Sequence, residues 1–316
     1  MPDPITPPAP TDRHPDFEHV AVYHAGDDEL AERLEPDIAR ALRAGDAVLV
    51  CSPPSVWQRL SARLGEASKA VEYVADDVRY DHPNVSMRIL HDFVRDRVRA
   101  GSAVAWSIGA IPYDGDAIRN ADWMRYEQAV NDVLQHLPLH AVCTYDVTAV
   151  ARELLDGARC AHPTDSDSSR PHAESHTIVS PIVPPTTQPL LRLHAQSSRS
   201  ARHTVADAYR ELIGEPALGE LTLIVSEIVS NALNHGAPPV MVSAWYDAGA
   251  KTSVIDVSDH GRGIDDPFVD LRPPRPRPGG AGMWIVGQLS ERVTSQRIDG
   301  VHHVTTLVRH GPRSND

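Results

Sequence analysis

Cysteine is scarce in this sequence, and the number of cysteines is odd. Cys51, Cys143 and Cys160 are the only three in 316 residues, and no CxxC spacing occurs. This pattern argues against a disulfide framework and against a zinc site, and it favours a reducing, cytoplasmic location.

Long apolar runs are also absent. No stretch of 18 or more apolar residues occurs, so we expect no membrane-spanning helix, and the N-terminus lacks the basic start and apolar core of a secretory signal. An excess of positive charge is missing too, since the formal net charge is -13. An acidic chain repels a phosphate backbone, so we expect protein partners and small ligands rather than direct binding of nucleic acid.

Composition divides the chain into two folded parts. Residues 160–189 are rich in Ser, Pro, Thr, Asp and His and have no lasting helical or strand period, which is typical of a linker. We therefore predict a disordered lead at 1–17, a first domain at 18–163, a linker at 164–188 and a second domain at 189–311. His162, His172 and His176 fall in the low-complexity stretch, but their spacing fits no metal-ligand pattern, so we interpret them as solvated linker residues.

Short apolar segments alternate with helical patterns in the first domain. Their continuous apolar character predicts strands covered on both faces, at 19–24, 47–51, 70–74, 103–108 and 140–145. Such alternation indicates an α/β fold with a doubly wound, mostly parallel sheet. Neither GxxxxGK[ST] nor GxGxxG follows any of these strands, so no P-loop or dinucleotide fingerprint is present.

The first domain resembles the MEDS sensory domain, which precedes ATPase domains in actinobacterial regulators. The resemblance lies in aromatic, acidic and polar positions spread over the domain: Trp106, Trp123, Tyr126, Glu127, Asn131, Cys143, Tyr145, Asp146 and His162-Pro163. The family implies a sensor of an unidentified signal and no catalysis in this domain.

A helix with a polar edge opens the most informative region. In LGELTLIVSEIVSNALNH (218–235), apolar residues recur at helical spacing, while Glu227 and Asn231 lie one turn apart on the same side. A carboxylate and an amide beside an apolar stripe need partners, such as a magnesium ion, a water or a ligand.

A strand and a glycine-rich helix start follow. Alternation in KTSVIDVSDHGRGI places Asp259 on the same face as the apolar Ile255 and Val257, with Gly261 and Gly263 directly after it. PGGAGMWIVGQL then leads Gly280 and Gly282 into a helix, whose free N–H groups suit phosphate. Each element alone is commonplace, but their order predicts one nucleotide site.

This order of motifs is similar to the GHKL ATPase superfamily, and SEIVSNALNHG, VSDHGRGI and GGAGMWIV look most like the anti-sigma regulatory factors, its serine/threonine kinase branch. The resemblance implies a C-terminal α/β sandwich of the histidine-kinase-like ATPase type, with ATP and Mg²⁺ as cofactors. Transferred position by position, it makes Asn231 the magnesium ligand and Asp259 the acceptor for the adenine amino group. It makes Glu227 the general base. The remaining contacts come from glycines, with Gly261 and Gly263 under the adenine and Gly280 and Gly282 over the triphosphate.

The last strand and the arginine-containing segment 265–279 also bear on the resemblance. His303 or Thr305 is expected where relatives have a pocket threonine. The segment 265–279 carries Arg272, Arg275 and Arg277, which reach the γ-phosphate or a partner in one interpretation and are solvated charges in the favoured one.

Three functions are compatible with these motifs. The favoured one is an anti-sigma factor that binds a sigma factor and phosphorylates a serine or threonine of an anti-anti-sigma protein, gated by the first domain. The branch often forms homodimers. The alternative is a non-catalytic, ATP-dependent protein-binding switch. A sensor histidine kinase fits least, because a proline-rich linker stands where its helical hairpin would be.

Overall fold

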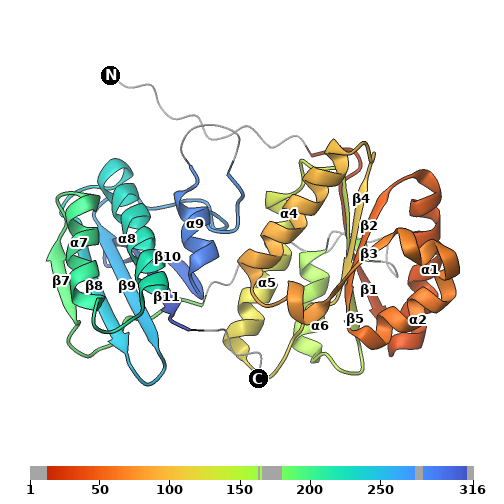
Figure 1. Cartoon of the computed structure of the whole chain (residues 1–316), viewed down its shortest axis with the longest axis horizontal. Coiled ribbons are helices and arrows are strands. Elements are labelled where there is room, and N and C mark those ends of the chain that lie inside the picture. Colours follow the sequence, from red (N-terminus) through yellow and green to blue (C-terminus); the bar gives the residue numbers. More distant parts are fainter. Residues whose placement is uncertain (1–12, 163, 166–179, 275–279, 312–316) are drawn as a thin grey trace. The chain divides into compact units, whose positions relative to one another are not determined.

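The computed structural model describes residues 13–162, 164–165, 180–274 and 280–311. Contacts divide the chain into two compact units, residues 1–178 and 179–316, and each unit is described by itself (Figure 1). In the part of the chain that the structure describes, no helix is both long and apolar enough to cross a membrane.

The N-terminal unit is built on a parallel sheet with the strand order β3-β2-β4-β5-β1-β6. Its strands are β1 (Glu18–His24), β2 (Ala47–Ser52), β3 (Val71–Ala75), β4 (Ala105–Gly109), β5 (Leu139–Asp146) and β6 (Thr164–Asp165). Its helices are α1 (Asp27–Ala44), α2 (Pro54–Leu64), η1 (Gly65–Ala70), α3 (Asp76–Arg79), α4 (Pro83–Arg99), α5 (Ala117–Val133) and α6 (Arg152–Ala161).

Helices cover both faces of this sheet, α1 and α2 on one side and α4 to α6 on the other (Figure 1). The stripe of Leu30, Leu34 and Ile38 on α1 packs against the buried valines of β2, so one apolar face of the helix lies on the sheet. Because β2 and β4 are buried on both faces, these central strands carry continuous apolar runs. The predicted doubly wound parallel sheet is therefore confirmed.

Two boundaries of this unit differ from the prediction. Phe17 is buried, and the His14 N–H donates to the carbonyl of Gln135 at 2.8 Å, so the end of the predicted disordered lead is anchored to the unit. His162 is also buried, at the end of α6, so its interpretation as a solvated linker residue is wrong. Residues 1–12, His172 and His176 lie outside the described residues.

The C-terminal unit is a layer of helices on an antiparallel sheet with the strand order β10-β11-β9-β8-β7. Its strands are β7 (Leu191–His194), β8 (Met241–Asp247), β9 (Thr252–Asp259), β10 (Arg292–Ile298) and β11 (Val301–Arg309). Its helices are α7 (Ser198–Tyr209), α8 (Glu215–His235) and α9 (Gly282–Leu289). The core lies between these helices and the sheet, which confirms the predicted two-layer α/β arrangement.

Candidate functional site

Helix α8 positions the polar pair predicted from the sequence. Its stripe of Leu221, Val225 and Ile228 is buried against the sheet, which fixes the rotation of the helix. Glu227 and Asn231 then lie at the partly exposed edge of that stripe. Neither side chain has a hydrogen-bond partner in the part of the chain that the structure describes, so both can engage a ligand.

Strand β9 positions the predicted carboxylate. Ile255, Val257 and Asp259 are all buried and share one face, with Asp259 at the end of the strand. Asp259 Oδ1 accepts hydrogen bonds from the backbone N–H of Gly261 at 2.6 Å and of Ala237 at 3.3 Å. These bonds fix the orientation of the carboxylate.

Glycine is required at the turn that follows β9. A Cβ atom on Gly261 would lie 2.6 Å from the Cα of Gly236 and 2.7 Å from Oδ1 of Asp259. Any larger residue would therefore displace either the neighbouring backbone or the carboxylate.

The start of α9 faces the polar pair of α8. Gly280 has a φ of 83°, which favours glycine, and its neighbour two positions on, Gly282, begins the helix. A Cβ on Gly282 would lie 2.6 Å from Oε2 of Glu227 and 3.6 Å from Nδ2 of Asn231. The glycine-rich segment thus passes directly over both side chains.

These three segments surround a cavity of about 230 Å³ within the C-terminal unit. Five of the predicted site residues line it: Asn231, Asp259, Gly263, Gly280 and Gly282. Its walls are otherwise mainly apolar, from residues of α8, α9, the strands and the segment after β9: Ile228, Val257, Ile264, Val269, Met283 and Val304. Apolar walls with a few convergent polar groups are typical of a small-molecule site. Glu227 and Gly261 lie next to the lining residues rather than among them.

His302 is a site residue that the sequence reasoning missed. In the register of β9 and β11, His302 lies opposite Asp259 and Val304 opposite Val257, so these four side chains share the face of the cavity. Nδ1 of His302 lies 3.1 Å from Oδ2 of Asp259, and its Nε2 lies 2.9 Å from Oγ of Ser295. The imidazole therefore bridges the carboxylate and the next strand.

His303 and Thr305 do not occupy the pocket position expected for them. Both face the other side of the sheet, where Nδ1 of His303 lies 3.1 Å from Oδ2 of Asp256 and Oγ1 of Thr305 donates to Oδ1 of Asp256 at 2.8 Å. The expectation is wrong because strand alternation gives the cavity the even-numbered residues of β11.

The sequence left two interpretations of the arginines after β9, a contact to the γ-phosphate or a partner, and solvated charge. Arg272 is engaged within its own segment, because its Nε donates to Oδ2 of Asp266 at 2.7 Å. Arg275 and Arg277 lie outside the described residues.

The geometry defines a two-domain α/β protein whose C-terminal domain holds a nucleotide-type cavity between a helix, a strand end and a glycine-rich helix start. Comparison with family models agrees with this class. Residues 18–163 match the model described as MEDS, MEthanogen/methylotroph, DcmR Sensory domain, and residues 191–309 match the model described as Histidine kinase-like ATPase domain. The chain thus combines a region that matches the MEDS model with a region that matches the histidine kinase-like ATPase model, and ATP is the nucleotide that this second domain implies.

One solved structure shows a limited similarity. The crystal structure of the RsbU and RsbW domains of Rv1364c from Mycobacterium tuberculosis aligns with a TM-score of 0.28 and 18% identity, over 38% of this chain and 32% of that one. This chain therefore spans about a third of the length of that protein. The comparison with curated proteins gives no match.

Proposed function

We propose that the chain is an ATP-dependent serine/threonine protein kinase of the anti-sigma type, which binds a sigma factor and phosphorylates an anti-anti-sigma protein. The observation that carries this proposal is the cavity that Asn231, Asp259 and the glycines at the start of α9 line together. The motif order that resembles the anti-sigma regulatory factors supplies the particular branch.

The residues present fit MgATP. Asn231 offers a side-chain oxygen that has no partner in the described part of the chain, and a hard cation such as Mg²⁺ prefers oxygen ligands. Asp259 keeps lone pairs beyond the two backbone N–H groups and His302, so it can accept the amino group of an adenine held between the apolar walls. MgATP, when bound, supplies the γ-phosphoryl group.

Glu227 is the residue we assign to proton transfer. Its carboxylate lies beside Gly282 and one turn from Asn231, next to the proposed phosphate end of the cavity. There it would accept the proton of an incoming serine or threonine hydroxyl.

The test is transfer of label from ATP to a purified anti-anti-sigma protein. Glu227→Gln should lower the rate of transfer about 10² to 10⁴-fold with ATP affinity retained, since general-base catalysis is worth that much. Glu220→Gln is the matched control, because Glu220 is an exposed glutamate on the same helix. Folded wild-type protein that binds ATP but transfers no label would contradict the kinase assignment.

A second function has one observation in its favour. Glu227 is not among the cavity-lining residues, whereas Ile264 and Val269, from the segment after β9, are. This arrangement suits a non-catalytic switch in which bound ATP orders that segment and the ordered segment binds the partner. Under this alternative Glu227→Gln leaves ATP-dependent partner binding intact and no variant alters label transfer, because the wild type has none.

The N-terminal domain is proposed to gate this site in response to its signal. The support is the order of the two domains along the chain, in which the family described as sensory precedes the ATPase domain. A sensor histidine kinase is less well supported, because the described residues 180–190 contain no helix before the ATPase domain.

A further inference from the structure

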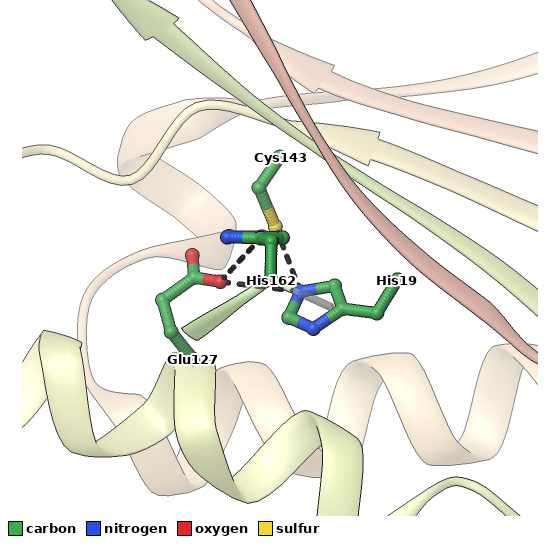
Figure 2. A group of neighbouring side chains, drawn as sticks. All are labelled: His19, Glu127, Cys143 and His162. Atoms are coloured by element: carbon green, nitrogen blue, oxygen red, sulfur yellow. Dashed lines mark hydrogen bonds and ion pairs between the residues drawn. The ribbon is translucent and has the colours of Figure 1, made fainter. Parts of the chain in front are cut away.

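Four potential metal ligands converge inside the N-terminal unit, far from the nucleotide cavity in sequence (Figure 2). His19 comes from β1, Glu127 from α5, Cys143 from β5 and His162 from the residue that ends α6. One ligand atom of each lies within 4.8 Å of every other. His19, Glu127 and His162 are buried, and Cys143 is partly buried.

The hydrogen bonds around the cluster fix which ring nitrogen of each histidine faces it. Nδ2 of Asn131 donates to the carbonyl of Ala161 at 2.5 Å, which directs Oδ1 of Asn131 toward Nδ1 of His19 at 3.1 Å. Nδ1 of His162 lies 2.7 Å from the carbonyl of Ala158. Because these oxygens only accept, both Nδ1 atoms carry protons, and each Nε2 is left to face the cluster with its lone pair.

At the centre of the cluster the Cys143 thiol can donate to Nε2 of His19, but among the described residues the Glu127 carboxylate and Nε2 of His162 have no hydrogen bond to satisfy them. Nε2 of His19 and of His162 each lie 3.2 Å from the same oxygen, Oε2 of Glu127, and Nε2 of His19 lies 3.3 Å from Sγ of Cys143. Within the described part of the chain, neither Glu127 oxygen nor Nε2 of His162 makes a hydrogen bond of acceptable geometry. A buried carboxylate in this condition is costly unless a cation stands among the ligands.

We propose that His19, Glu127, Cys143 and His162 bind one divalent transition-metal ion of the Zn²⁺ class. Two imidazoles, a thiolate and a carboxylate are typical ligands of such an ion, whereas Mg²⁺ and Ca²⁺ select oxygen. A thiolate and a carboxylate balance the two positive charges, so the loaded site is neutral and suits a buried position.

The geometry agrees with four-coordination. With metal–ligand bonds of about 2.0 to 2.3 Å, tetrahedral ligand atoms are about 3.3 to 3.6 Å apart. Three of the six separations, 3.2, 3.2 and 3.3 Å, lie next to this range, and the other three are within 4.8 Å, so the side chains would close on the ion to complete the tetrahedron. Asn131 and the Ala158 carbonyl then act as the outer partners that orient the two ligating imidazoles.

The metal site would link the residue that follows α6 to the central strands of the sheet and to α5. His162 directly follows α6, while its partners belong to the central strands and α5. Metal binding would therefore hold the last turn of α6 against β1 and β5.

Metal binding can be measured on the full-length protein after chelator treatment and without nucleotide. Titration with Co²⁺ should give a thiolate-to-Co²⁺ charge-transfer band and the intense visible bands of tetrahedral Co²⁺, saturating at one ion per chain, and one equivalent of Zn²⁺ should abolish them. Cys143→Ser should remove the charge-transfer band, and Glu127→Gln should weaken Zn²⁺ binding about 10-fold or more. Cys160→Ser is the matched control, since Cys160 is an exposed cysteine on α6, and it should leave the spectrum unchanged.

Three results would overturn the proposal. They are a wild-type Co²⁺ spectrum without a thiolate band, an unchanged band in Cys143→Ser, and loss of the band in Cys160→Ser. The wild-type spectrum decides the matter even where a variant fails to fold. A Co²⁺ ion at Asn231 would give no thiolate band, so the nucleotide site does not interfere.

Discussion

At the scale of single residues, Asp259 is a buried side chain with contacts to both of its carboxylate oxygens. Its Oδ1 accepts two backbone N–H groups and its Oδ2 faces His302, so both oxygens must be acceptors. Asp259→Asn replaces one acceptor by an NH₂ donor in this setting. We expect ATP affinity to fall about 10- to 100-fold, because an unsatisfied buried polar group costs roughly 1–3 kcal/mol.

Isothermal titration with MgATP measures this change. Asp256→Asn is the matched control, since Asp256 lies on the same strand but faces away from the cavity, toward His303 and Thr305. It should leave ATP affinity within about twofold of the wild type. Equal losses in the two variants would mean that the effect comes from weakening β9 and not from a contact to the nucleotide.

The sequence predicts part of this site and misses the rest for a physical reason. Alternation along β9 is local, so it predicts that Asp259 shares a face with Ile255 and Val257. The choice between His302 and His303 depends on the register of β11 against β9, which is set by contacts about 45 residues apart in the chain. A pair of adjacent histidines carries no local signal that would decide it.

At the scale of elements, α8 and α9 carry glycines with opposite consequences. Gly219 is exposed in α8, and an added Cβ there meets nothing within 4 Å. Gly219→Ala should stabilise the C-terminal unit by about 0.5–1 kcal/mol, since glycine is a poor helix former, and ATP affinity should not change.

Gly282→Ala is the same substitution at the start of α9, where the new Cβ would lie 2.6 Å from Oε2 of Glu227. It should displace the Glu227 carboxylate and lower label transfer, whatever it gains in helix propensity. Denaturant unfolding and the transfer assay compare the two variants directly. A loss of transfer in Gly219→Ala, or full activity in Gly282→Ala, would contradict this account.

The elements that the sequence predicts best are those with repeated local patterns. The five predicted strands of the N-terminal sheet and the apolar stripe of α1 are present because burial against the sheet leaves continuous or periodic apolar runs. The ends of the unit were harder to predict. Phe17 is buried, and His162 contacts Glu127 of α5 and Tyr145 of β5, but the compositional bias around these two residues gives no sign of this burial.

At the scale of the whole molecule, the absence of a local pattern also explains why the cluster of four metal-ligating side chains was not predicted. Its ligands come from four elements, with more than 100 residues between His19 and Cys143, so no short spacing exists to detect. The spacing of the three cysteines and of the histidines near the linker excludes only zinc motifs whose ligands are close together in the sequence. The parallel sheet brings His19 and Cys143 onto neighbouring strands, a proximity that no spacing in the sequence indicates.

The two sites also permit a test of the proposed gating. If the N-terminal domain gates the ATP site through its metal cluster, metal binding and ATP binding are coupled, and the coupling must be reciprocal. The factor by which Zn²⁺ changes ATP affinity must then equal the factor by which ATP changes Zn²⁺ affinity. We expect equal factors of about 5 or more, which is the lower end of typical allosteric coupling.

Cys143→Ser should abolish the effect of Zn²⁺ on ATP affinity, whereas Asp259→Asn should shift the effect of ATP on Zn²⁺ affinity to about 10- to 100-fold higher ATP concentrations while Zn²⁺ still binds. Isothermal titration of each ligand with and without the other gives all four affinities. If neither ligand changes the affinity for the other, metal binding stabilises the N-terminal domain without affecting the ATP site. A ligand shifts an equilibrium only by its difference in affinity for the two states.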